Sequence, residues 1–273
     1  MMDSATWLVT RREVTDPCRK GTALASVSFL GHATALLDVE GVRVLTDPVL
    51  RSRVMFLRRV APPLPPATYD AVDVVVISHL HHDHCDVPSL AMLGRDVCTV
   101  VPSGGEGFLR DNGFRNVVSL RPGQTHQVGP VTLTATPAAH DGTRKPFGPR
   151  AAAVGYLITG SDYRIYFAGD TDLFPGMRDL SPRLDLALLP VWGWGPNLGP
   201  GHLDPARAAW AVELLRPRRT VPIHWGTLFP YGLRTFYPDR LHVPPRAFAS
   251  AVADRGSTEA VVLDPGGEPV WLP

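Results

Sequence analysis

The chain has 273 residues, of which 44% are hydrophobic and 19% are charged. This composition is typical of a globular protein and excludes a disordered chain. The formal net charge is +1, so no overall field favours nucleic acid as a partner. We expect one domain over residues 1–273, a length that a single large domain can reach.

The three cysteines are Cys18, Cys85 and Cys98, and none of them forms a C-x-x-C pair. A sparse, odd set of this kind favours a reducing compartment over a disulfide framework. The first residues contain no apolar run typical of a signal peptide, and no stretch approaches the roughly 18 apolar residues of a membrane span. We therefore expect a cytoplasmic protein without a transmembrane segment, and we leave peripheral membrane contact and homo-oligomers open.

The first predicted elements are three short strands, over residues 27–30, 35–39 and 42–46, with Glu40 and Gly41 in a tight turn. Residues 49–66 read as irregular, because four arginines alternate there with apolar residues and prolines. The run DVVVIS over residues 73–78 is typical of a strand buried on both faces.

Further strands are predicted over residues 131–136, 164–168, 186–189 and 220–223. A helix begins at Asp204-Pro205, where Asp is a favoured N-cap residue and Pro suits the first turn, and Pro217 ends it. Strands thus come in runs with fewer helices between them. This pattern favours packed sheets with helices outside over a doubly wound sheet.

The segment SHLHHDHCD places four ionisable side chains directly after the buried strand at residues 73–78. Imidazole and carboxylate are the ligands of catalytic zinc and similar cations. A polar loop with chance histidines is the alternative, but four desolvated ionisable groups would be costly without a metal. The four candidate ligands are His79, His81, Asp83 and His84.

Three more candidate ligands each follow a predicted strand. His140 follows the strand at 131–136, Asp170 follows the strand at 164–168, and His224 follows the strand at 220–223. A single residue of this kind is more often just hydrogen-bonded. Their common position at strand ends predicts that they meet at one site.

The order H-x-H-x-D-H, then His, then Gly-Asp, then His resembles the metallo-β-lactamase superfamily. That resemblance implies an α/β fold, a four-layer αβ/βα sandwich, with two divalent metal ions at one edge of the sheets. Zinc is the expected metal, with manganese or iron as alternatives. The resemblance implies one ion on His79, His81 and His140, a second on Asp83, His84 and His224, and Asp170 as the bridge between them.

The segments GHAT, TDP, GPGHLDP and IHWGT are similar to the branch that contains N-acylphosphatidylethanolamine phospholipase D and ascorbate-6-phosphate lactonase. By this resemblance, His202 contacts the substrate or the reacting group and is not a ligand. His32 and Asp47 either support the site or satisfy buried turns, and both interpretations stay open. The β-lactamases that use a cysteine ligand fit poorly, and the 53 residues between Asp170 and His224 leave no room for an inserted nuclease domain.

The expected reaction is hydrolysis by a hydroxide that bridges the two cations, which also polarise the scissile group. Asp83 and His202 are the candidates for handling the proton of the leaving group. The leading hypothesis is a phosphodiesterase that acts on a small or lipid-like phosphodiester. A lactonase or another ester or amide hydrolase is the alternative, and the complete ligand set argues against a non-enzymatic binding protein.

Four residues are candidates for binding the substrate. Trp192 and Trp194 are expected to be exposed in a loop rich in Gly and Pro, and Arg144 and Lys145 are placed to meet a phosphate. Phe236, like Trp225, is assigned to the core. Residues 49–66 act either as a flap at the mouth of the site or as an apolar cap on the core with solvated arginines.

Overall fold

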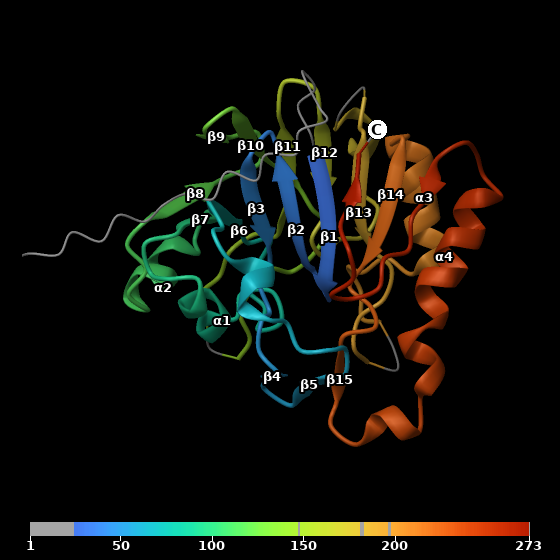
Figure 1. Cartoon of the computed structure of the whole chain (residues 1–273), viewed down its shortest axis with the longest axis horizontal. Coiled ribbons are helices and arrows are strands. Elements are labelled where there is room, and N and C mark those ends of the chain that lie inside the picture. Colours follow the sequence, from blue (N-terminus) through green and yellow to red (C-terminus); the bar gives the residue numbers. More distant parts are fainter. Residues whose placement is uncertain (1–24, 147, 181–182, 196–197, 273) are drawn as a thin grey trace, which may run out of the picture.

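A computed structural model describes residues 25–146, 148–180, 183–195 and 198–272 of the chain (Figure 1). Its first seven-stranded sheet has the strand order β17-β1-β2-β3-β6-β7-β8. The strands from β17 to β3 pair antiparallel, and those from β3 to β8 pair parallel. The members are β1 (Ala25–Gly31), β2 (Thr34–Val39), β3 (Val42–Thr46), β6 (Val74–Val76), β7 (Cys98–Pro102), β8 (Val117–Leu120) and β17 (Val270–Trp271).

The second seven-stranded sheet has the order β16-β14-β13-β12-β11-β10-β9. Its strands β9 to β12 form an antiparallel meander, and β12, β13, β14 and β16 run parallel. The members are β9 (Thr125–Val128), β10 (Val131–Pro137), β11 (Val154–Thr159), β12 (Arg164–Phe167), β13 (Leu186–Pro190), β14 (Arg219–Ile223) and β16 (Glu259–Ala260).

Helices cover the outer faces of both sheets. In Figure 1, α1 and α2 lie beside the first sheet, and α3 and α4 lie beside the second. The expected four-layer αβ/βα sandwich is therefore confirmed. The helices are α1 (Val87–Met92), α2 (Glu106–Asp111), α3 (Pro205–Leu215) and α4 (Val243–Ala253), with the 3₁₀ helices η1 (Pro66–Tyr69), η2 (Met177–Asp179), η3 (Leu233–Thr235) and η4 (Pro238–Leu241). None of the helices in the described residues has the length and apolar character needed to cross a membrane.

Strand β6 shows why the central strands are continuously apolar. Val74 and Val76 belong to the core between the two sheets, whereas Val75 and Ile77 belong to the cluster under α1 and α2. Successive side chains of a strand point to opposite faces, and here both faces are covered. The β-branched run therefore predicts this strand correctly. The residues from Ser78 onward follow the C-terminal end of the strand.

A third, small sheet has the order β15-β5-β4 and lies below the sandwich in Figure 1. It joins β4 (Arg53–Val54) and β5 (Leu57–Arg59) to β15 (Leu228–Pro230). The prediction that residues 49–66 are irregular is therefore wrong for this hairpin. Each strand is too short to show an alternating pattern, and the tip lacks the usual Gly or Asn of a two-residue turn.

Local sequence signals correctly predict the ends of helix α3 and the turn between β2 and β3. The side chain of Asp204 accepts a hydrogen bond from the backbone nitrogen of Arg207, as expected of an N-cap residue. At the other end, Arg216 has the left-handed conformation that precedes Pro217. The turn at Glu40 and Gly41 has positive φ at both residues, which suits a two-residue hairpin connection.

Candidate metal centre

Three of the predicted ligands form one cluster at the ends of β6 and β10. The ligand atoms of His79, His81 and His140 all lie within 4.8 Å of one another. His81 Nδ1 is 2.9 Å from His79 Nε2 and 3.3 Å from His140 Nε2. Three imidazole nitrogens that face one point have the arrangement of a cation site rather than of a hydrogen-bond network.

A second cluster contains Asp83, His84 and His224, together with His32. His84 Nε2 is 3.0 Å from His224 Nε2. Asp83 Oδ2 lies 3.8 Å from His224 Nε2 and 3.9 Å from His84 Nε2. The side chains come from the loop after β6 and from the end of β14, so the fold brings together residues 140 positions apart.

Asp170 follows β12 and adjoins both clusters, because it also forms a group with His140 and His202 whose ligand atoms lie within 4.8 Å of one another. Its Oδ2 is 3.2 Å from His84 Nε2 and 3.4 Å from His202 Nε2, and its Oδ1 is 3.4 Å from His224 Nε2. Within the described residues Oδ1 is buried and has no hydrogen-bond partner. A buried carboxylate oxygen without a donor is costly, and a cation would satisfy it.

The donor set fits tetrahedral cations. Zinc–nitrogen bonds of about 2.0–2.1 Å place two ligand atoms of a tetrahedral site roughly 3.3 Å apart. The shortest nitrogen–nitrogen distances in the two clusters are 2.9 Å and 3.0 Å. The nitrogens would separate by a few tenths of an ångström to bind a cation, which rotation of the imidazoles about χ2 provides.

Burial keeps most of these imidazoles neutral. It lowers the pKa of His81 to about 4 and that of His224 to about 3, and it lowers the pKa of His79 well below its ordinary value. Neutral imidazole is the form that binds a cation. Burial would also lower the pKa of His84, but Asp170 and Asp83 raise it well above its ordinary value. A bound cation would take the place of that proton between the carboxylates.

Asp47 contacts His84 on the side away from the centre, and Ser78 holds Asp47 in place. Asp47 is fully buried, and its Oδ2 lies 2.7 Å from His84 Nδ1. Its two oxygens also accept hydrogen bonds from the backbone nitrogen and the hydroxyl of Ser78, at 2.7 Å and 2.5 Å. This carboxylate fixes which nitrogen of His84 faces the centre. The sequence left the role of Asp47 open, and the structure assigns it a contact with a predicted ligand.

His32 has a comparable position beside Asp83. The side chain is fully buried, with Nε2 2.9 Å from Asp83 Oδ2. His32, Asp47 and His224 all have positive φ, of 57°, 32° and 64°. Positive φ in residues other than glycine costs energy that the surrounding structure must supply, and such residues cluster at functional sites.

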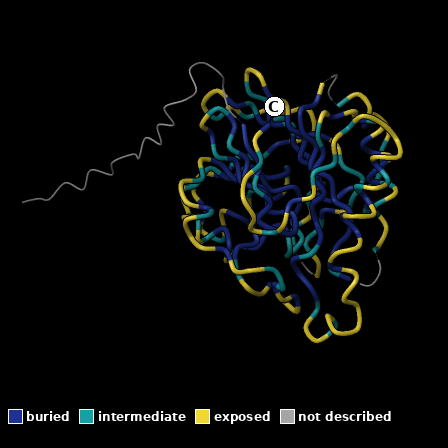
Figure 2. Tube along the Cα trace, turned by 45° about the vertical axis from the view of Figure 1, so that its right-hand side comes forward, coloured by how far each residue is buried: buried dark blue, intermediate teal, exposed yellow. Residues whose placement is uncertain are grey.

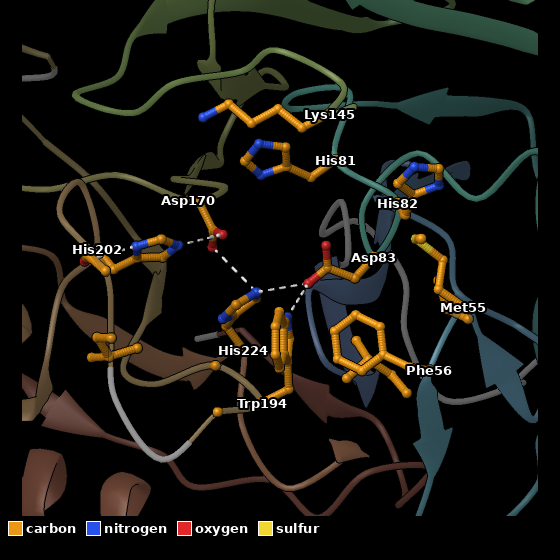
Figure 3. A pocket seen from close by; sticks show the side chains of 16 residues that line it. Met55, Phe56, His81, His82, Asp83, Lys145, Asp170, Trp194, His202 and His224 are labelled. Atoms are coloured by element: carbon orange, nitrogen blue, oxygen red, sulfur yellow. Dashed lines mark hydrogen bonds and ion pairs between the residues drawn. The ribbon is translucent and has the colours of Figure 1, made fainter. Parts of the chain in front are cut away.

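Members of both clusters form the floor of a pocket with a volume of about 340 Å³ (Figure 3). His81, Asp83, Asp170, His202 and His224 line its polar side. This volume falls in the range of small-molecule sites. His202, predicted to contact the substrate, therefore faces the same space as the candidate ligands, and its Nδ1 lies 3.1 Å from the backbone oxygen of Gly199.

The opposite wall of the pocket is apolar. Met55 and Phe56 from the β4–β5 hairpin line it together with Trp194 and Leu198. The rings of Phe56 and Trp194 meet edge to face, with centroids 5.1 Å apart. Trp194 Nε1 donates a hydrogen bond of 3.0 Å to Asp83 Oδ2. The apolar wall and the polar floor are thus joined by one tryptophan.

Some predicted substrate residues lie elsewhere. The expectation of an exposed Trp192 is wrong, because its side chain is 9% exposed and belongs to the core between the sheets. Arg144 does not line the pocket; it donates hydrogen bonds to the backbone oxygens of Leu80 and Cys85 and so holds the ligand-bearing loop. Lys145 does line the pocket.

The core assignment of the two other aromatic residues is half correct. Trp225 is buried and stacks on Phe29, as expected. Phe236 is 74% exposed, so its assignment to the core is wrong. Sequence alone offers no distinction here, because both follow β14 in a segment rich in aromatic residues.

Cys85 is not a candidate ligand. Its side chain is buried, and burial raises the pKa of its thiol to about 12. Cys85 and Cys98 are both free cysteines, and Cys18 lies outside the described residues.

His82 is a pocket residue that the sequence did not single out. It lines the pocket, with Nδ1 2.9 Å from Arg144 Nη2. Its place inside the histidine-rich motif was the available signal.

Comparison with known proteins establishes the family. Residues 42–225 match the model of the beta-lactamase superfamily domain. This chain belongs to the metallo-β-lactamase superfamily. An uncharacterized protein of Mycobacterium tuberculosis is 34% identical over 218 residues, which are 74% of this chain but 59% of that protein. The chain therefore spans less than two thirds of the length of this mycobacterial relative.

Two further relatives carry descriptive names. A metal-dependent hydrolase of Koribacter versatilis is 32% identical over 211 residues, covering 74% of this chain and 84% of that protein. The N-acyl-phosphatidylethanolamine-hydrolyzing phospholipase D 1 of Caenorhabditis elegans is 30% identical over 268 residues, covering 88% of this chain and 74% of that protein. The domain of this superfamily member is thus related to metal-dependent hydrolases.

Solved structures show the same fold. Igni18, a metallo hydrolase from Ignicoccus hospitalis, has a TM-score of 0.71 and 24% identity, over 92% of this chain and 99% of that one. CmlA, a diiron beta-hydroxylase from Streptomyces venezuelae, has a TM-score of 0.64 and 18% identity, over 93% of this chain and 55% of that one. These likenesses concern the fold and leave the reaction to be argued from the site.

Proposed function

We propose that this superfamily member is a dinuclear metal-dependent hydrolase, a phosphodiesterase for a small or lipid-like phosphodiester. One observation carries the proposal: two groups of His and Asp side chains meet around the buried Asp170, on the floor of a pocket whose other wall is apolar. The polar floor suits an ionic reacting group, and the apolar wall suits a chain attached to it.

The ligand set that we propose is the predicted one. His79, His81 and His140 would hold one cation, Asp83, His84 and His224 would hold the other, and Asp170 would reach both. Mixed nitrogen and oxygen ligands at near-tetrahedral distances favour zinc, with manganese or iron as alternatives. Two bound cations would supply Lewis-acid polarisation of the scissile group and acidify the attacking water.

His202 and Asp83 are our candidates for the proton steps. His202 lies outside both three-ligand sets and faces the pocket, with Nε2 3.4 Å from Asp170 Oδ2. Asp83 has its Oδ2 engaged by His32 and by Trp194. These two contacts hold the Asp83 carboxylate in one orientation beside His84 and His224.

The walls of the pocket define the proposed substrate class. Met55, Phe56, Trp194 and Leu198 offer an apolar surface beside the floor. Lys145 adds a positive charge at the pocket, although its ammonium group also pairs with Asp141 at 2.8 Å. A phosphodiester carries one negative charge next to its organic groups and therefore suits both surfaces. The name of the C. elegans relative, which hydrolyses a phospholipid, supports this class.

A substrate panel tests the proposal. The protein, reconstituted with Zn²⁺ or Mn²⁺, is assayed on bis(p-nitrophenyl) phosphate, on a set of lactones and on nitrocefin, with chelator-treated protein as the control. We expect metal-dependent hydrolysis of the phosphodiester. Turnover of lactones without turnover of phosphodiesters would favour the carbonyl hydrolase instead and contradict the proposal.

Chain length tests the lipid-like part separately. In a series of phosphodiesters with progressively longer alkyl groups, each additional buried CH₂ contributes about 0.8 kcal/mol. We expect kcat/KM to rise by roughly fourfold per CH₂ until the apolar wall is covered. A flat dependence on chain length would restrict the substrate to small soluble phosphodiesters.

A further inference from the structure

The tip of the β4–β5 hairpin carries two large apolar side chains. Val54 and Leu57 pair across the hairpin and point into a small buried cluster, whereas Met55 and Phe56 form the turn between them. Phe56 is 52% exposed, and Met55 is similarly exposed with a φ of 49°. Turns of this kind favour Gly, Asn or Asp. The exposed Met-Phe pair therefore does not follow from the needs of folding.

Strand β15 and the segment after it extend this surface. The backbone nitrogen of Tyr231 donates a hydrogen bond to the Phe56 oxygen at 3.2 Å, so the two segments lie side by side. Tyr231 is 77% exposed, and Phe236 is also largely exposed. In Figure 1 the hairpin and the segment after β15 lie at the lower end of the molecule, and Figure 2 shows that end as exposed.

The same segments are rich in positive charge. Residues 49–66 contain four arginines and no acidic residue, and residues 228–246 contain three arginines and one aspartate. Of the four, Arg51 pairs with Asp86 and Arg59 is buried, which leaves Arg53 and Arg58 exposed. Arg58 and Arg234 are both exposed, and the Arg58 guanidinium lies over the Tyr231 ring at 5.4 Å from its centre. Because the whole chain has a net charge of only +1, this end concentrates positive charge that is balanced elsewhere.

The exposed surface is continuous with the pocket. Met55 and Phe56 line the pocket and are also half-exposed to solvent at the hairpin tip. In Figure 3 the Phe56 ring lies beside Trp194, and Trp194 bonds to Asp83 on the floor. An apolar path therefore leads from the outer surface to the candidate metal centre.

We propose that this surface binds membranes that contain anionic phospholipids and turns the pocket mouth toward the bilayer. We call it the tip patch and define it by Met55, Phe56, Arg58, Tyr231, Arg234 and Phe236. Aromatic side chains insert at the interface of a bilayer, and arginines are attracted to its negative headgroups. A second copy of the chain fits less well, because two tip patches would bring like charges together.

The tip patch would thus let a lipid-like substrate pass from the bilayer to the pocket without crossing water. This delivery rests on the proposed phosphodiesterase function, whereas membrane binding itself does not. Binding is measured without turnover, so failure of one does not imply failure of the other.

Vesicle co-sedimentation of the metal-loaded protein tests the proposal. We expect binding to vesicles of phosphatidylcholine mixed with phosphatidylglycerol, weaker binding to phosphatidylcholine alone, and a loss of binding as salt screens the arginines. The variant Phe236→Ser should weaken binding roughly tenfold, since an exposed aromatic ring no longer leaves water. Arg234→Glu should weaken it at least fivefold, since each arginine near an anionic surface contributes about 1 kcal/mol.

Matched controls lie at other places on the surface. Trp210→Ser removes a half-exposed aromatic residue from α3, and Arg121→Glu reverses an exposed charge between β8 and β9. Both controls should bind vesicles like the wild type, and all four variants should keep the wild-type thermal transition. Hydrolysis of bis(p-nitrophenyl) phosphate in free solution, measured alongside, reports on the proposed function independently.

Three outcomes would overturn the proposal. The first is that wild-type protein does not sediment with anionic vesicles, and the second is that tip-patch variants and controls lose binding equally. The third is that the wild type self-associates without binding vesicles and the Phe236→Ser variant is monomeric. In that case the tip patch is an interface between copies of the chain.

Discussion

Three of the candidate ligands have a neighbour that fixes their orientation. His84 is held by Asp47, Asp83 is held by His32 and Trp194, and His140 has Nδ1 2.9 Å from the backbone oxygen of Gly201. These supporting contacts set which nitrogen or oxygen faces the centre. Two of the supporting residues, His32 and Asp47, directly follow β1 and β3, in the segments GHAT and TDP.

Replacing Asp47 by Asn tests this dependence. The amide keeps the volume but loses the charge that faces His84 Nδ1, so we expect metal affinity to fall roughly 10- to 100-fold. Metal titration followed by activity at saturating metal measures the change. Asp38→Asn, which alters a half-buried carboxyl group on β2 away from the pocket, is the control. Equal affinities for the wild type and Asp47→Asn would refute the orienting role.

His202→Ala separates turnover from metal binding. If His202 handles a proton, kcat should fall roughly 10²- to 10⁴-fold, while the metal content stays that of the wild type. His126→Ala on β9, at the far edge of the second sheet, serves as a matched control. Loss of metal in His202→Ala would instead make His202 a ligand and change the proposed set of seven.

The sequence predicted the candidate ligands better than the residues that line the walls of the pocket. The H-x-H-x-D-H spacing selects side chains along one loop. His140, Asp170 and His224 were selected because each follows a predicted strand. Exposure is different, because it depends on what packs against a side chain. Trp192 is covered by the core and by Arg240, whose guanidinium lies 4.9 Å from the centre of its ring, and no local signal predicts that partner.

At the scale of elements, the site depends on strands that end at the same edge of the two sheets. The junction after β12 is the most crowded of these. Gly169 has a φ of +60°, and a Cβ at this position would lie 2.4 Å from Ser78 Cβ. Ser78 itself bonds to Asp47. The glycine therefore lets the loop with Asp170 approach the loop with His79.

Gly169→Ala should consequently lower both stability and activity. The backbone must shift away from Ser78, which moves Asp170 relative to the other candidate ligands. We expect a loss of more than 2 kcal/mol in the free energy of unfolding, on the order of an overpacked core position with a left-handed backbone. Gly123→Ala is the matched control, because Gly123 also has positive φ but a Cβ there meets no atom within 4 Å.

Chemical denaturation and turnover of both variants measure the difference. Gly123→Ala should show the conformational cost of roughly 1–2 kcal/mol alone and keep full activity. If Gly169→Ala behaves like Gly123→Ala, the close approach to Ser78 does not support the site.

The short β4–β5 hairpin could not be predicted from local sequence, since its pairing with β15 depends on residues more than 160 positions later in the chain.

At the scale of the whole molecule, the two sheets are joined by a buried tyrosine. Tyr156 on β11 donates its hydroxyl hydrogen to the backbone oxygen of Ile77, at 2.9 Å, across the core. Burial raises the pKa of this hydroxyl well above its ordinary value. The same residue therefore contributes to packing between the layers and to the dependence of stability on pH.

Tyr156→Phe should destabilise the protein by about 1–3 kcal/mol at neutral pH, because the Ile77 oxygen loses a buried donor. The folded pKa is raised, so the tyrosine's contribution is complete below the unfolded pKa of about 10 and is lost as pH rises above it. The variant should accordingly show a shallower alkaline decline. Tyr237→Phe, which changes an exposed tyrosine, should match the wild type in urea denaturation, both at neutral pH and above the unfolded pKa of about 10.

The layered architecture followed from patterns that the chain repeats many times. Continuous β-branched runs predicted the doubly covered strands, and runs of strands with few helices predicted packed sheets. The sequence did not predict the helices α1, α2 and α4, because α1 and α2 have six residues each and α4 has two prolines in its first turn. That residues 1–273 form one domain stays a prediction, since residues 1–24 lie outside the described part.

The metal content of the active protein tests the central claim most directly. Elemental analysis by inductively coupled plasma mass spectrometry should find two divalent cations per chain in wild-type protein that hydrolyses bis(p-nitrophenyl) phosphate. His81→Ala and Asp170→Ala should lose cations and activity together while circular dichroism shows a folded protein. A fully active wild type with one cation per chain, or with none, would contradict the dinuclear centre.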